Sequence, residues 1–176
     1  LSEKTDITVL LANPDFSAGA EGWLGTTFTD ANGYIAEQYN KNFDNYQLLE
    51  NMPAGYYTLS CQGFYRYGSV GNAKSAYYAD EEQHYAMLYI NDTSSPLLSI
   101  FADQTNYTMN PYTYPDNVAA ANEAFNTIGT YTGNSVTIEL KEPGNLRLGI
   151  RKYTGINSDW TIFDNFRIVY YGNHAS

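Results

Sequence analysis

Short runs in which apolar and polar residues alternate, separated by clusters of turn residues, dominate this chain. Tyr57, Leu59 and Cys61 alternate with polar residues after the turn at Pro53–Gly55. Successive side chains on a β-strand point to opposite faces, so a period of two indicates a strand with one buried and one solvated face. Such strands need another layer to cover their apolar face. The pattern therefore predicts an all-β fold of packed sheets.

Runs of the same kind predict the remaining strands. The expected set is Ile7–Ala12, Gly33–Glu37, Asn45–Leu49, Tyr85–Ile90, Leu97–Ala102, Val136–Leu140, Leu146–Ile150 and Thr161–Tyr171. Pro143–Asn145 joins two of these runs and is expected to form a β-hairpin turn. About nine strands with no internal repeat and no linker predict one β-sandwich domain of jelly-roll type over residues 1–176.

One segment departs from the strand pattern. Val118–Phe125 is rich in alanine and follows Asp116 and Asn117, which are favourable helix N-cap residues. We expect one short helix there, laid over a sheet. Gly68–Glu82 and the tyrosine-rich segment Asn106–Asp116 are expected to be long connections.

Composition excludes several classes of partner. Hydrophobic residues make up 43% of the chain and charged residues 16%, which argues against a disordered segment. The net charge is -10, and phosphate backbones are bound chiefly by Lys and Arg, so nucleic acid is not an expected partner. The longest apolar run, Val9–Ala12, has the length of a strand and predicts no membrane insertion.

The sequence contains no recognised catalytic motif. Cys61 is the only cysteine, and its position beside Leu59 on the apolar face predicts a buried, inert thiol. A glycan-cleaving enzyme would need two carboxylates that face each other across a groove, for which Glu37 and Asp44 are candidates. The catalytic set is therefore expected to be empty, and a jelly-roll glycan-cleaving enzyme stays an alternative.

Aromatic residues are the stronger functional signal, because the chain has 18 Tyr. Sugar rings pack their C–H faces on aromatic rings while nearby polar side chains bind the hydroxyls. The residues expected to contact carbohydrate are Tyr65, Arg66, Tyr67, Tyr112, Tyr114 and Trp160. Arg66 lies on the opposite strand face from Tyr57 and Cys61, so it should point to solvent or into a groove. The pattern leaves open whether Trp160 closes the end of the sandwich or faces a cleft, and Trp23 is expected to lie in or near the core.

Five segments in order carry a resemblance to a known group of proteins. They are Asn13–Phe16, Gly22–Trp23, Gln47, Pro53–Ser60 and Phe163–Ile168. Together they resemble the carbohydrate-binding modules related to families four, nine and twenty-two, which have a galactose-binding-like jelly roll. The variant with Phe64–Arg66 resembles modules common in surface and secreted proteins of gut Bacteroidetes.

The resemblance implies a function and a cofactor. It implies a non-catalytic module that targets a polysaccharide-active enzyme, such as a glycoside hydrolase, or a surface protein to plant or other glycans. It also implies a structural calcium ion held by Asp15 and Asp164, to which Glu37 is added on its position. The expected protein is a monomeric module excised from a larger multidomain chain that is secreted or at the cell surface. A structural spacer or protein-interaction domain without glycan affinity is the second alternative.

Overall fold

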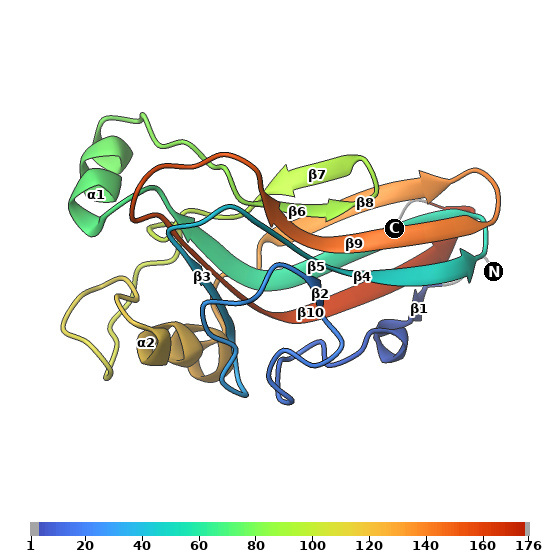
Figure 1. The fold of residues 1–176 in the computed structure, drawn as a ribbon, viewed down its shortest axis with the longest axis horizontal. Coiled ribbons are helices and arrows are strands. Elements are labelled where there is room, and N and C mark those ends of the chain that lie inside the picture. The colour runs from blue at the N-terminus through green and yellow to red at the C-terminus, as the bar shows by residue number, and fades with distance from the viewer. Residues whose placement is uncertain (1–3, 175–176) are drawn as a thin grey trace.

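The strands form two antiparallel sheets that pack face to face (Figure 1). The structure is a computed structural model that describes residues 4–174. The first sheet contains β1 (Thr5–Asp6), β3 (Ala36–Tyr39), β5 (Gly55–Arg66), β8 (Asn134–Leu140) and β10 (Trp160–Gly172). The second contains β2 (Leu24–Gly25), β4 (Phe43–Met52), β6 (Met87–Ile90), β7 (Thr93–Pro96) and β9 (Gly144–Lys152). From β3 onward the chain passes repeatedly from one sheet to the other, and the predicted β-sandwich of jelly-roll type is confirmed.

The main core lies between the two sheets. Along β5 the side chains of Tyr57, Leu59 and Cys61 are buried on the inner face, as their alternation predicted. Burial strongly raises the pKa of the Cys61 thiol, which keeps it protonated and inert. Trp23 also lies in this core, stacked on Phe16 with ring centroids 5.0 Å apart.

A second core covers the outer face of the first sheet. Phe64 of β5 and Ile162 of β10 point away from the sandwich interior and are fully buried beneath a helical segment. That segment is α2 (Val118–Asn122), which continues as a π-helical turn, Glu123–Ile128. The Asn117 side chain caps it by accepting a hydrogen bond from the Ala120 N–H at 2.7 Å. The predicted helix is confirmed. Because it covers part of the outer sheet face, side chains on that face are buried beneath it.

Three local predictions were wrong. The connection after Gly68 contains helix α1 (Val70–Tyr78), capped by Ser69; Ala73 is its sole buried residue, so no apolar period revealed it. Ile7–Ala12 is largely a 3-10 helix, Thr8–Leu10, rather than a strand. Leu97–Ala102 is a turn region that follows β7. Within residues 4–174, no helix has the length and apolar character needed to cross a membrane.

The close approach of β4 and β9 gives a test of the sheet register. A Cβ on Gly149 would lie 2.0 Å from the Asn45 carbonyl oxygen, whereas a Cβ on Gly144 of the same strand would meet nothing closer than 3.8 Å. We expect Gly149→Ala to lower the free energy of unfolding by about 1–3 kcal/mol or more. Gly144→Ala should change it by less than about 0.5 kcal/mol. Urea unfolding of both variants checks this, and equal losses would contradict the register.

Candidate functional site

Three side chains from adjacent strands form a row across the outer face of the first sheet. Trp160 of β10 pairs directly with Tyr39 of β3 on one side and with Arg66 of β5 on the other. Side chains of directly opposed residues are roughly 4.5–5.5 Å apart at Cβ, so the three are immediate neighbours. The row therefore places two aromatic rings and a guanidinium side by side at one end of the sandwich.

The row forms the floor of a cleft of about 310 Å³, called the Arg66 cleft below. Its lining is Glu37, Tyr39, Arg66, Asp116, Asn117, Val118 and Trp160. Strands β3, β5 and β10 supply the floor, and the segment that enters α2 supplies a wall. Tyr39 is the exposed ring of the row, with 43% of its surface accessible, whereas only 4% of the surface of Trp160 is accessible.

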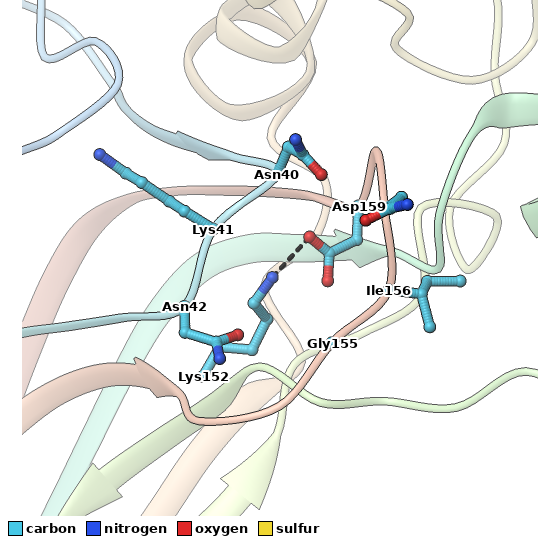
Figure 2. Close-up of a pocket in the computed structure, with 8 residues that line it drawn as sticks. Asn40, Lys41, Asn42, Lys152, Gly155, Ile156 and Asp159 are labelled. Carbon is cyan, nitrogen blue, oxygen red and sulfur yellow. Dashed lines mark hydrogen bonds and ion pairs between the residues drawn. The ribbon is translucent and has the colours of Figure 1, made fainter.

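A buried ion pair anchors the loop beside this cleft. Lys152 Nζ donates to Asp159 Oδ1 at 2.5 Å, and both side chains are almost completely buried (Figure 2). The Tyr65 hydroxyl donates to the other Asp159 oxygen at 2.7 Å. Gly155 lies so close that a Cβ there would be 2.4 Å from Asp159 Oδ2. These contacts fix the loop between β9 and β10, which also lines a second cleft of about 260 Å³ with Asn40 and Lys41.

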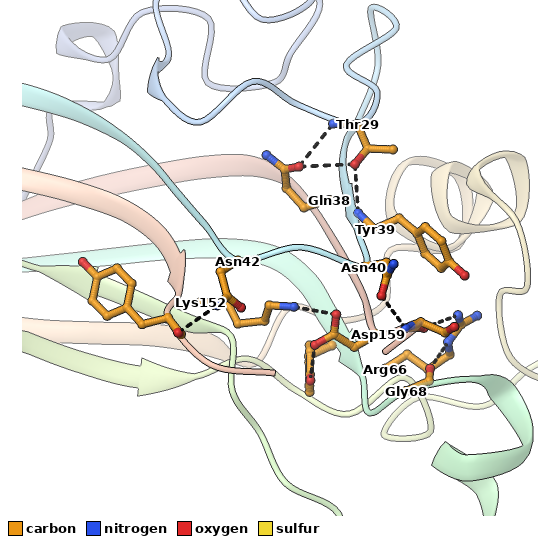
Figure 3. Close-up of polar contacts among 12 residues, drawn as sticks. Thr29, Gln38, Tyr39, Asn40, Asn42, Arg66, Gly68, Lys152 and Asp159 are labelled. Carbon is orange, nitrogen blue, oxygen red and sulfur yellow. Dashed lines mark hydrogen bonds and ion pairs between the residues drawn. The ribbon is translucent and has the colours of Figure 1, made fainter. Parts of the chain in front are cut away.

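The anchored loop in turn holds Arg66. Its Nη2 donates to the Ser158 carbonyl at 3.0 Å and its Nε to the Gly68 carbonyl at 2.8 Å (Figure 3). Its Nη1 lies 3.9 Å from Asp116 Oδ1, and the guanidinium carbon is 5.2 Å from the centroid of the Trp160 ring. Burial lowers the pKa of Arg66, and the Asp116 carboxylate partly opposes that shift. Arg66 is thus a fixed cation at the base of the cleft.

Glu37 completes the polar lining. Its Oε2 accepts a hydrogen bond of 2.6 Å from the Trp160 indole Nε1–H, which fixes the orientation of the ring. The other oxygen of Glu37 has no hydrogen bond to any residue from 4 to 174. The cleft therefore offers an acceptor next to an aromatic surface.

Two of the six predicted sugar contacts, Arg66 and Trp160, line the Arg66 cleft. As predicted, Arg66 points into a groove rather than into the sandwich. Tyr65 was wrongly predicted: it is 1% exposed because it shares the inner strand face with Cys61, and its hydroxyl is bound to Asp159. Trp160 faces the cleft rather than acting only as an end plug.

The other predicted aromatic residues lie elsewhere. Tyr67 is half-buried and packs edge-on against Tyr85, with ring centroids 5.9 Å apart. Tyr114 is 5% exposed, beneath Tyr112, whose ring stacks on it at 5.2 Å. Tyr112 is 45% exposed, and neither tyrosine lines the Arg66 cleft.

Sequence reasoning missed Tyr39, Asp116 and Asn117 as lining residues. Tyr39 lies two positions after Glu37, so an extension of the expected strand would have placed both on one face. Asp116 and Asn117 were noted as helix caps, and only the tertiary position of α2 brings them to the cleft.

The predicted calcium ligands do not gather as a set of three. Glu37 lies in the Arg66 cleft, and among the described residues no three Asp, Glu, His or Cys side chains cluster. Asp15 and Asp164 do interact: burial raises the pKa of Asp164 to about 7, and the Asp15 carboxylate contributes to that rise. Asp164 is 1% exposed and accepts from Asn126 and from the Asn165 N–H, with no ion pair to a described cation. Glu37 is thus separate from Asp164, and the calcium ion stays a prediction.

Comparison with known proteins finds similar solved structures. No protein-family profile and no curated protein matches the chain. One of the similar solved structures is TmCBM61 in complex with β-1,4-galactotriose, at 14% sequence identity and a TM-score of 0.48, over 90% of this chain and 95% of that one. The fold class, a two-sheet β-sandwich, rests on the strand pairing described above. Membership of families four, nine and twenty-two stays a prediction.

The buried ion pair gives a stability test. Asp159→Asn leaves the Lys152 charge buried without a counter-charge, and we expect a loss of about 3–5 kcal/mol in the free energy of unfolding. Asp6→Asn is the matched control, because the Asp6–Arg167 pair has a similar geometry at 2.9 Å but both side chains are about half exposed. That variant should lose no more than about 1 kcal/mol. Adding Lys152→Met to Asp159→Asn should recover part of the loss; similar losses in the two single variants would contradict this account.

Proposed function

We propose that this chain is a non-catalytic carbohydrate-binding module that binds a polysaccharide or oligosaccharide in the Arg66 cleft. The observation that carries the proposal is the row of Tyr39, Trp160 and Arg66 beside the carboxylate of Glu37. An apolar ring surface with a few fixed polar groups beside it suits a polar ligand that has apolar faces. A sugar ring has both properties.

The binding mode follows from the geometry. The exposed Tyr39 ring is placed to stack against the C–H face of a sugar, and Trp160 supports the same floor. Aromatic contacts are worth about 0.5–1.5 kcal/mol beyond the area that they bury. One or two of them, offset by the cost of ordering a flexible glycan, correspond to dissociation constants on the order of micromolar to millimolar.

Further parts of the proposal rest on the sequence resemblance alone. In this proposal the module is a monomer within a multidomain chain that is secreted or at the cell surface. It targets a polysaccharide-active enzyme, such as a glycoside hydrolase, or a surface protein to its glycan. The Bacteroidetes-type variant of families four, nine and twenty-two is the group that the sequence resembles.

Specific observations favour each alternative. Glu37 and Asp116 line one cleft, and a glycan-cleaving enzyme needs two carboxylates in one cleft. The burial of Tyr65 and Tyr114 is what a spacer domain would show. A screen of neutral glycans by affinity gel, with reducing ends assayed in the same mixtures, separates the three functions. Retardation without new reducing ends supports the binding module, new reducing ends indicate an enzyme, and neither result indicates a spacer.

Two equally exposed tyrosines locate the site. Tyr39 is 43% exposed in the Arg66 cleft and Tyr112 is 45% exposed on the tyrosine-rich loop. We expect Tyr39→Ala to weaken the binding of a glycan found in the screen about tenfold or more, because it removes the exposed stacking surface. Tyr112→Ala should bind like the parent. Calorimetric titration of both variants measures this, and loss of binding in Tyr112→Ala alone would move the site to the loop.

We also propose that calcium stabilises the fold through Asp15 and Asp164. The support is a buried carboxylate at Asp164 that has no cationic partner among the described residues and lies near the Asp15 charge. A bound cation would neutralise both carboxylates. The oxygen chemistry of these groups suits calcium, and the role is structural rather than catalytic.

Thermal melting with calcium and with a chelator tests this site. The raised pKa of Asp164, about 7, means that protons compete with the cation below that pH, so calcium should stabilise more above pH 7 than well below it. At 100 times its dissociation constant a ligand adds about 2.7 kcal/mol, or roughly 5–10 °C for a chain of this length. Asp164→Asn should abolish the shift. No shift in the parent protein, or an equal shift in the variant, would remove the calcium proposal.

A further inference from the structure

The charges in the Arg66 cleft differ in how fully they are engaged. Its charged lining consists of two carboxylates, Glu37 and Asp116, and one cation, Arg66. Each nitrogen group of Arg66 already has a protein partner: Nε with Gly68, Nη2 with Ser158 and Nη1 with Asp116. The Arg66 side chain is also 10% exposed, against 30% for that of Asp116. The cation is therefore enclosed, and a carboxylate is the more accessible charge.

The remaining polar groups of the lining are mostly acceptors. One oxygen of Glu37 has no hydrogen bond to the described residues, and the contact of Asp116 with Arg66 involves Oδ1. The Asn117 amide is partly engaged, because its Oδ1 caps α2 and one N–H of its Nδ2 donates to the Met109 carbonyl at 3.3 Å. Carboxylate oxygens make strong hydrogen bonds with hydroxyl donors. The cleft is thus suited to hydroxyl groups.

An acidic sugar meets a different environment in the same cleft. Its carboxylate would approach two protein carboxylates, while the one cation is already paired and enclosed. Like charges brought together across an interface disfavour binding, and the chain's net charge of -10 adds to the repulsion. The same charges do not oppose a glycan that carries only hydroxyl groups.

We propose that the Arg66 cleft selects neutral glycans and rejects polyuronates, and that Glu37 and Asp116 cause this selectivity. The inference rests on the proposed function, because it concerns the ligand class of the same site. It assigns the two carboxylates a role in specificity rather than in catalysis.

The test compares one polymer in two charge states. A neutral glycan with free C6 hydroxyls, retained in the screen, is oxidised at C6 to the corresponding polyuronate, so that backbone and linkage stay the same. We expect the oxidised form to bind the parent protein at least tenfold more weakly in calorimetric titrations at low salt. Added salt should narrow this ratio, because the cleft is open to solvent and its charges are screened.

Substitution in the cleft assigns the cause. The double variant Glu37→Gln, Asp116→Asn keeps the size of both side chains and removes both charges. Its ratio of neutral to oxidised affinity should fall at least threefold relative to the parent, whatever happens to neutral binding itself. Asp6→Asn, which removes one exposed charge outside the cleft, should leave the ratio unchanged. Melting curves confirm that each variant is folded.

The outcomes separate the two proposals. If the parent retains no glycan, the proposed function fails and the selectivity fails with it. If neutral glycans bind but the oxidised form binds equally or more tightly, the selectivity is overturned and the binding function stands. If the oxidised form binds weakly and the double variant keeps the full ratio, the two carboxylates are not the cause and the inference is overturned.

Discussion

The register of β10 is the constraint on which the candidate site depends. β10 pairs with β5 along most of its length and with β3 at its start, so Trp160 lies opposite both Tyr39 and Arg66. A slip of one residue would turn Trp160 into the sandwich interior and bring Thr161 to the outer face. The same register places Ile162 under α2, and burial of this apolar row on the outer face resists such a slip. The site therefore inherits its geometry from core packing.

The loop before β10 converts this register into a fixed cation. The Lys152–Asp159 pair and the Tyr65 hydroxyl hold the loop in place. The Ser158 carbonyl of this loop then accepts a hydrogen bond from Arg66. Buried ion pairs contribute little net stability, yet breaking one is costly, which makes this pair a means of fixing a conformation. These contacts give the guanidinium a fixed position next to Trp160.

Local pattern predicted the elements better than it predicted the site. The alternation at Tyr57–Cys61 predicted the sandwich because it separates an apolar inner face of the strand from a polar outer face. The same alternation extends to Tyr65 and would have placed it in the core. Tyr65 was instead predicted to contact a ligand because its side chain is aromatic. The side of Arg66 followed correctly from that alternation. A longer strand would have put Tyr39 on the face of Glu37, but its place beside Trp160 depends on the β3–β10 register. Asp116 reaches the cleft through the position of α2, and neither long-range contact leaves a signal in a single sequence.

The two tryptophan indole N–H groups provide the most direct measurement of where a ligand binds. Trp160 Nε1 donates to Glu37 in the Arg66 cleft. Trp23 belongs to the main core between the sheets, and its Nε1 donates to the Asn13 carbonyl. In a ¹⁵N-labelled protein titrated with a neutral glycan, the account predicts that the Trp160 indole resonance shifts progressively while that of Trp23 stays in place. A stationary Trp160 resonance, with shifts confined to the amides of the tyrosine-rich loop, would contradict it.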